Sequence, residues 1–230
     1  MSIIPLIYAH RGASIAETEH TKEAYQTAIN QGADGFECDV RLTKDQKIIC
    51  YHDANTKRVH DIDLKISSTT FEELNSKISI LPLADLLDFA ISNKKNLAIE
   101  TKHPNRFGSL IERKVNQLLI QRSGDIKRSG IEINLMSFSW FATNRNMKTQ
   151  FSSVYLVKNL RQLRLLTAGT VGISIDIVRK NPTLILKLHS NGKRVFVWTV
   201  NEIADYELCR ELNVSAIITD NPARARSALR

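Results

Sequence analysis

Two carboxylates separated by a single residue mark the first place where this sequence can do chemistry. Glu37 and Asp39 lie in a short apolar run, and Glu100 ends another. Side chains two positions apart on a strand project from the same face. Converging carboxylates repel one another unless a cation lies between them, and an all-oxygen set suits Mg²⁺ or Ca²⁺ and also accepts Mn²⁺. Ion pairs with Arg11 or Lys102 are the alternative interpretation.

Histidines and cations follow the same kind of run. His10 and Arg11 come directly after one apolar run, His52 directly after another, and Lys102 stands two positions after Glu100. Two histidines beside a metal can act as general acid and general base. A single histidine at a strand end is more often only a hydrogen-bonding residue, but two of them beside three carboxylates favour the catalytic interpretation.

These residues need a scaffold, and apolar runs of strand character alternate with helical patterns along the chain. Eight strands are predicted, at Ile3–Ala9, Gly35–Val40, Asn96–Glu100, Ile131–Phe138, Ser153–Val157, Val171–Ile175, Arg194–Thr199 and Ser215–Thr219. A helix is predicted after each, at Thr21–Gln31, Leu83–Ala90, Ser109–Gln121, Trp140–Met147, Leu160–Leu166, Pro182–His189, Ile203–Leu212 and Pro222–Ala228. This alternation indicates parallel strands joined by helices.

The repeat length favours a closed barrel over an open sheet. The 230 residues divided over eight units give about 29 residues each, which is typical of an α/β protein with a TIM (β/α)₈ barrel. The G-x-G-x-x-G fingerprint of a doubly wound sheet is absent. We expect a single domain over residues 1–230. An irregular polar stretch over residues 53–82, after a further extended run at Lys47–Tyr51, is expected to be a small insertion over the site.

Composition narrows the class of protein further. Apolar residues make up 43% and charged residues 24%, and the formal charge is +8 without any run of five Lys or Arg residues. We therefore expect no nucleic-acid binding and no stable membrane insertion. The three cysteines match no metal or redox spacing, and the segment Met1–Ala9 lacks the features of a signal peptide. Both observations point to the cytoplasm. The sequence leaves the oligomeric state open.

The ordered motifs together resemble a known family. His10-Arg11-Gly12, Glu37-x-Asp39, His52-Asp53 and Glu100-x-Lys102 occur in the order of the glycerophosphodiester phosphodiesterase family. The later motifs Trp198-Thr199-Val200-Asn201 and Ile217-Ile218-Thr219-Asp220-Asn221-Pro222 are similar to it as well. The resemblance implies a TIM barrel of the phosphatidylinositol-phospholipase-C-like type. It also implies hydrolysis of glycerophosphodiesters to sn-glycerol 3-phosphate and an alcohol, with one divalent cation.

Carried over by position, the resemblance assigns roles to seven residues. The metal ligands would be Glu37, Asp39 and Glu100. The acid–base pair would be His10 and His52, in either order, and the phosphate oxygens would be held by Arg11 and Lys102. The attacking group is the substrate's own glycerol hydroxyl or a water, and the resemblance favours the hydroxyl.

One motif departs from the family. Thr18-Glu19-His20-Thr21 stands where the family usually has Pro-Glu-Asn-Thr. Glu19 is expected to bond near the metal or to Arg11, and Thr21 to cap the following helix. His20 either keeps a hydrogen bond of the asparagine or changes the metal's surroundings. Phe138 and Trp198 either fill the barrel or line a glycerol pocket.

Two other functions remain open at this stage. A lysophospholipid-cleaving phospholipase of the D or C type has the same fold, but it needs an apolar landing surface, and the sequence shows no apolar loop of that kind. A catalytically impaired barrel that binds ligands is the other alternative. Asp53 is expected to point away from His52 and to be structural, and Asp220 to need no explanation beyond the start of a helix.

Overall fold

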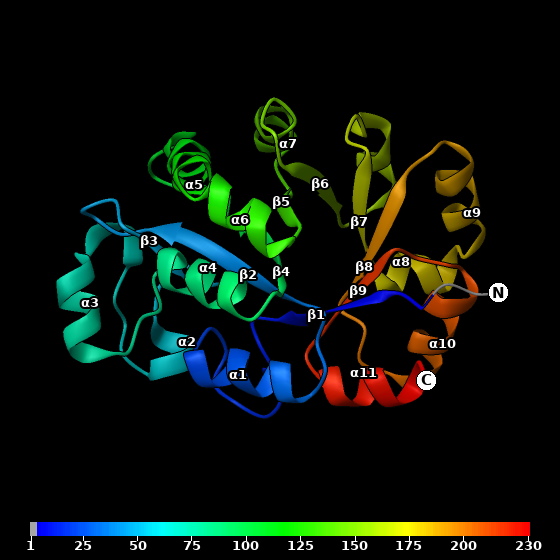
Figure 1. Cartoon of the computed structure of the whole chain (residues 1–230). Helices are drawn as coiled ribbons and strands as arrows, with labels where there is room; N and C mark the ends of the chain where they lie inside the picture. Colours follow the sequence, from blue (N-terminus) through cyan, green and yellow to red (C-terminus); the bar gives the residue numbers. More distant parts are fainter. Residues whose placement is uncertain (1–3) are drawn as a thin grey trace.

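The structure, a computed structural model that describes residues 4–230, is built around a closed barrel of eight parallel strands (Figure 1). The barrel strands are β1 (Leu6–His10), β2 (Gly35–Leu42), β4 (Asn96–Thr101), β5 (Ile133–Ser137), β6 (Ser152–Val157), β7 (Thr170–Ser174), β8 (Arg194–Trp198) and β9 (Ala216–Thr219). Their order is β1-β9-β8-β7-β6-β5-β4-β2, and β1 pairs with β2 to close the ring. The predicted TIM barrel is confirmed.

Helices join the strands and surround the barrel (Figure 1). They are α1 (Lys22–Asn30), α4 (Leu83–Ser92), α5 (Leu110–Gln121), α6 (Ser123–Ser129), α7 (Trp140–Asn146), α8 (Ile175–Lys180), α9 (Thr183–Ser190), α10 (Ile203–Glu211), α11 (Pro222–Ala228) and the 3₁₀ helix η2 (Leu160–Leu165). The expected helix at 160–166 is therefore a 3₁₀ helix, and α6 and α8 were not expected. Ile3, the predicted start of the first strand, lies outside the described residues.

The strand expected to run to Ile175 ends one residue earlier. Ser174 has extended backbone geometry, and its side chain accepts a hydrogen bond from the Asp176 amide. A serine in this position caps a helix, because it satisfies one of the amides that have no partner in the first turn. Ile175 therefore begins α8 instead of ending β7. Thr21 caps α1 in the same way, as predicted, by accepting from the Ala24 amide.

Each barrel strand has one face toward the barrel interior and one toward the helices, and side chains alternate between these two faces. One set fills the interior of the barrel, namely Tyr8, Ala98, Met136, Val154, Leu156, Phe196, Ala216 and Ile218. Their neighbours along each strand face the helices, and Cys38 is buried among these outer residues, as expected. Gly35 leaves room for the Tyr8 ring in the barrel interior, because a Cβ at position 35 would lie 2.7 Å from a carbon of that ring.

The segment between β2 and α4 forms an excursion beside the barrel, at the left of Figure 1. It contains β3 (Ile48–Cys50), which pairs antiparallel with β2, and then α2 (Lys57–His60), η1 (Ile66–Ser68) and α3 (Phe71–Lys77). The excursion has its own apolar cluster of Ile49, Tyr51, Ile66, Leu74, Ile78 and Ile80. This cluster stabilises the segment that carries His52.

Candidate active site

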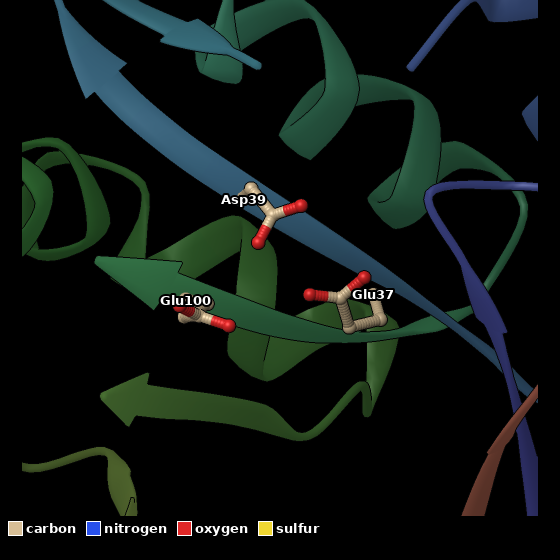
Figure 2. Close-up of side chains that lie close together, drawn as sticks. All are labelled: Glu37, Asp39 and Glu100. Atoms are coloured by element: carbon tan, nitrogen blue, oxygen red, sulfur yellow. The ribbon is translucent and has the colours of Figure 1, made fainter. Parts of the chain in front are cut away.

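Strand pairing brings the three predicted acids together. His10 on β1 pairs with Glu37 on β2, and Asp39 pairs with Glu100 on β4. Figure 2 shows the carboxylates of Glu37, Asp39 and Glu100 directed toward a common space. One oxygen of each carboxylate lies within 4.8 Å of one oxygen of the other two, and all three side chains are buried. Strand geometry alone therefore produces the convergence expected from the E-x-D spacing.

Two cations accompany these acids. Lys102 Nζ lies 2.9 Å from Asp39 Oδ1 and 2.8 Å from Glu100 Oε1. Arg11 Nε lies 2.9 Å from Asp39 Oδ2, in an ion pair whose geometry is not that of a hydrogen bond. The ion pairs that the sequence suggested as the alternative to a metal are thus present, and they centre on Asp39. Glu37 forms none with either cation.

The electrostatics of the three acids differ. Burial and the charge of Asp39 raise the pKa of Glu37 well above its usual range, and the same causes raise the pKa of Glu100 to about 7. Burial would also raise the pKa of Asp39, but the hydrogen bond from His20 and the charges of Lys102 and Arg11 outweigh it and lower that pKa well below its usual range. Three buried carboxylates that resist joint ionisation are a set whose charge a divalent cation would balance. The residues therefore fit such a cation.

His10 is held by an acid from the far end of the chain. Its Nδ1 lies 2.6 Å from Oδ1 of Asp220, and its Nε2 lies 4.0 Å from Oε2 of Glu37. Asp220 also accepts hydrogen bonds from Ser14 Oγ at 3.0 Å and from the Asn201 amide at 2.6 Å. The expectation that Asp220 only starts a helix was wrong. Asn221 caps α11 instead, by accepting from the Arg224 amide.

His52 has a matching arrangement on the other side of the site. Its Nδ1 lies 2.7 Å from Oδ1 of Asp53, so the expectation that Asp53 points away from His52 was also wrong. The chain turns directly after β3, and strand alternation does not hold there. The His52 carbonyl accepts two hydrogen bonds from the Arg41 guanidinium, at 2.9 and 2.8 Å. Burial lowers the pKa of His52.

Arg58 links the two loops that carry these groups. Its Nε donates to Asp53 at 2.6 Å, and its two terminal nitrogens donate to the two Glu19 oxygens at 2.9 and 2.6 Å. Glu19 in turn accepts from Arg11 at 3.3 Å, as the sequence suggested. One guanidinium on the excursion therefore supports both the partner of His52 and the partner of Arg11. No motif marked Arg58 in the sequence.

His20 replaces the family's asparagine and occupies a buried position. Its Nε2 lies 3.2 Å from Asp39 Oδ2, and its Nδ1 lies 3.0 Å from the Tyr25 hydroxyl. Burial lowers the pKa of His20, which keeps the ring neutral. Because an ionised carboxylate only accepts, Nε2 must carry the proton and donate it to Asp39. The structure thus shows His20 hydrogen-bonded to Asp39, one of the three predicted metal ligands.

A pocket of about 150 Å³ opens between these groups. Its lining includes His10, Arg11, Glu37, His52, Glu100, Lys102, Phe138, Lys158 and Trp198. Phe138 and Trp198 meet edge to face at 5.3 Å between ring centroids, and Lys158 Nζ lies 4.4 Å from the Phe138 centroid. Both aromatic residues thus line the pocket and also pack against the barrel interior. Sequence reasoning missed Lys158, although it directly follows β6.

Comparison with known proteins gives a consistent result. The profile of the glycerophosphoryl diester phosphodiesterase family matches residues 10–224. A probable glycerophosphodiester phosphodiesterase 1 of Mycobacterium tuberculosis is 33% identical, and the match covers 98% of this chain and 92% of that protein. Within residues 4–230, no helix is long and apolar enough to cross a membrane.

Solved structures share the fold at lower identity. A glycerophosphodiester phosphodiesterase from Thermotoga maritima matches with a TM-score of 0.81 and 23% identity, over the full length of both chains. A phosphodiesterase from Oleispira antarctica, solved with the product sn-glycerol-3-phosphate, matches with a TM-score of 0.78 and 21% identity, over 98% of this chain and 97% of that one. The chain belongs to the glycerophosphoryl diester phosphodiesterase family and is a phosphoric diester hydrolase.

Proposed function

We propose that this protein hydrolyses glycerophosphodiesters to sn-glycerol 3-phosphate and an alcohol, with two histidines as acid and base. The observation that carries the proposal is the symmetry of the pocket. His10 and His52 each have Nδ1 against a carboxylate, and both line a pocket that also contains Arg11 and Lys102. The product bound to the Oleispira antarctica relative supports the same substrate class.

The proposal includes one divalent cation held by Glu37, Asp39 and Glu100. Their oxygen donors suit Mg²⁺ or Ca²⁺ and also accept Mn²⁺. When bound, such an ion polarises a phosphoryl oxygen and stabilises the negative charge that develops in the reaction. Its positive charge would also balance the negative charges of Glu37 and Glu100, the two acids whose pKa values are raised. Restoring activity with each cation in turn after EDTA treatment distinguishes the three ions.

Arg11 and Lys102 would bind the phosphate. A phosphodiester carries one negative charge, and its cleavage builds up more on the oxygens that are not bridging. Both cations line the pocket and are anchored by Asp39, so they stay in place without a bound substrate. Donors held in advance where charge develops stabilise a transition state more than mobile ones do.

We assign His52 as the base and His10 as the acid. With Nδ1 directed at a carboxylate, each ring presents Nε2 for proton transfer. The lowered pKa of His52 keeps it neutral, as a base that takes the proton of the attacking hydroxyl requires. Asp220 has a pKa lowered to about 2, so it stays ionised and balances a positive charge on His10. His10 would then give its proton to the departing alkoxide as the P–O bond to the alcohol breaks, which leaves a cyclic phosphate. A water would open this ring to sn-glycerol 3-phosphate, with the two histidines in exchanged roles.

The volume of the pocket suits one half of the substrate and not the whole molecule. About 150 Å³ is small beside the several hundred Å³ of pockets that enclose drug-sized ligands. The glycerol phosphate half would fill it, with Phe138 and Trp198 beside the glycerol. The alcohol would then extend toward the mouth and be selected less strictly.

The experiment is to follow release of sn-glycerol 3-phosphate from glycerophosphocholine and glycerophosphoethanolamine. EDTA is expected to abolish the release, and one of the three cations to restore it. Lysophosphatidylcholine serves as the comparison substrate, and its faster cleavage would favour a lysophospholipid-cleaving enzyme. An absence of turnover with every cation would favour a barrel that binds ligands without cleaving them.

We also place the enzyme in the cytoplasm. Cys38, Cys50 and Cys209 are free and buried, and disulfides are rare in reducing compartments. Fractionation of cells with an antibody against the protein tests this placement.

A further inference from the structure

Exposed apolar side chains follow four barrel strands, at the end of the barrel that holds the pocket. Four of them, with their exposed fractions, form what we call the apolar rim: Ile15 (64%), Phe141 (67%), Leu160 (47%) and Ile203 (50%). They follow β1, β5, β6 and β8, so each stands just beyond the carboxyl end of a barrel strand. In a parallel barrel those ends share one face, which is the face that holds the active site.

Two members of the apolar rim lie close to partners or chain neighbours of residues that line the pocket. The Ile15 amide donates to the Asp220 carbonyl at 3.3 Å. Phe141 stands three positions after Phe138, which lines the pocket, and the centroid of its ring lies 5.2 Å from that of Trp140.

The other two members lie equally close along the chain. Leu160 stands two positions after Lys158, which lines the pocket, and Ile203 two positions after Asn201, whose amide donates to Asp220. The strand order places β1, β9, β8, β7, β6 and β5 consecutively, while the excursion follows β2 on the remaining arc. The apolar rim therefore occupies the arc that the excursion leaves open.

Unpaired positive charge accompanies the rim. Lys158, Arg161 and Arg164, which we call the basic strip, are exposed and lie along the segment 158–166, which has no acidic residue. Among residues 4–230, no carboxylate forms an ion pair with any of the three. Most other arginines of the excursion and helices are paired, as Arg58 and Arg179 show. Leu160 lies exposed between Lys158 and Arg161 in the chain, and Leu165 lies exposed directly after Arg164.

Single exposed apolar residues are normal on a soluble protein and need no explanation. Here they share one edge with three unpaired cations, and Lys158 joins the two features to the pocket through Phe138. Apolar side chains interspersed with Lys and Arg are the composition that binds the boundary of an anionic bilayer. A nucleic acid would instead need base-stacking or groove-binding elements.

We propose that the apolar rim and the basic strip dock the mouth of the pocket onto an anionic lipid surface. The contact is peripheral and reversible, with the rim side chains at the head-group boundary and the cations against lipid phosphates. It brings the active site to where lipid-derived phosphodiesters arise. No local sequence pattern indicates it, because the four rim residues come from four separate segments that only the barrel brings to one face.

The test is co-sedimentation of the full chain with vesicles, which needs no turnover and so stands apart from the proposed catalysis. We expect binding to vesicles of equal parts phosphatidylcholine and phosphatidylglycerol at low salt, little binding to phosphatidylcholine alone, and release by high salt. Each cation near an anionic surface contributes about fivefold in affinity. The variant K158Q/R161Q/R164Q is therefore expected to bind roughly 100-fold more weakly.

Matched variants separate docking from general surface effects. The variant F141S/L160S/I203S is expected to lose binding at low salt, whereas I120S/L186S removes exposed apolar side chains away from the mouth and is expected to bind normally. The charge control K94Q/K127Q/K187Q removes three exposed lysines elsewhere and is expected to lose far less affinity than the basic-strip variant. Circular dichroism verifies that each variant is folded.

Three outcomes would overturn the proposal. The first is no binding to anionic vesicles by the folded wild-type chain, including the case in which it retains DNA instead. The second is equal binding to neutral and anionic vesicles. The third is an equal loss of vesicle binding in the rim or strip variants and in their control variants.

Discussion

Nδ1 of His10 lies 2.6 Å from Oδ1 of Asp220, although the two residues are 210 positions apart in the chain. The contact spans the seam between the first and last barrel strands, since β1 pairs with β9. Closing the barrel therefore also completes the histidine–carboxylate pair. This pair orients the imidazole and presents Nε2 to the pocket.

Replacing Asp220 by Asn should slow turnover while leaving the pocket in place. The amide removes the negative charge that balances a protonated His10, so we expect kcat to fall roughly 100-fold, within the range that general acid–base groups contribute. KM should change little, because Asp220 does not touch the phosphate site. Steady-state kinetics on glycerophosphocholine measures both. Asp176→Asn, which changes an exposed carboxylate of α8, is the control, and an equal loss there would contradict the account.

The same carboxylate should make stability depend on pH. Its pKa is lowered from 3.8 to about 2 in the folded protein, where the hydrogen bonds and charge of its partners outweigh burial. A lowered carboxyl pKa stabilises the fold above the unfolded value, by about 2 kcal/mol here, and this contribution disappears as pH falls through the folded value. Asp220→Asn should therefore lower the free energy of unfolding at neutral pH and have little effect near pH 2. Urea denaturation at stepped pH values measures the difference, and a constant difference down to pH 2 would refute the linkage.

Arg58 should act through the residues it positions. Arg58→Ala releases Asp53 and Glu19 together, and through them loosens His52 and Arg11. We expect kcat/KM to fall roughly tenfold or more, since misplaced catalytic groups lose orientation. Added guanidinium should restore part of the activity of this variant and none in the wild type. Arg128→Ala, which breaks only a surface pair with Asp125, should behave as wild type, and an absence of guanidinium rescue would count against positioning.

His20 should matter for metal affinity through Asp39. Removing the hydrogen bond from Nε2 leaves Asp39 less firmly oriented, and groups that orient metal ligands typically contribute about 10- to 100-fold in affinity. We expect His20→Ala to weaken Mn²⁺ binding by that factor in calorimetry. His20→Asn, which restores the family's residue, should weaken it less. If both variants bound Mn²⁺ as the wild type does, His20 would have no part in orienting Asp39.

Much of the fold was predictable because its signals are local. Each barrel strand is an apolar run of a few residues, and each helix has a periodic apolar face, so alternation alone indicates the barrel. The unexpected elements are short and depend on single residues. Ser174 ends β7 early by capping α8. The segment 160–165 starts at a capping box of Asn159 and Gln162 and forms a 3₁₀ helix.

The residues of the site were predictable to the same extent as their local signals allow. Glu37, Asp39, Glu100 and Lys102 follow from strand alternation and parallel register, which sequence spacing encodes. Loop residues do not obey that period, which explains the wrong expectation for Asp53.

Three further residues act through partners that lie elsewhere in the chain. These are Asp220 with His10, Arg58 with Glu19, and Lys158 with Phe138. Only the closed barrel brings such partners together, so local patterns carry no signal for them.

The most direct test of the two-histidine account varies the leaving group. His10→Ala, His52→Ala and the wild type are compared on glycerophosphocholine and on the matching 4-nitrophenyl diester, whose phenolate leaves without a proton. We predict that His10→Ala loses roughly 100-fold or more on glycerophosphocholine but far less on the nitrophenyl ester, while His52→Ala loses activity on both. Equal losses of His10→Ala on the two substrates, or full activity of either variant on glycerophosphocholine, would contradict the assignment.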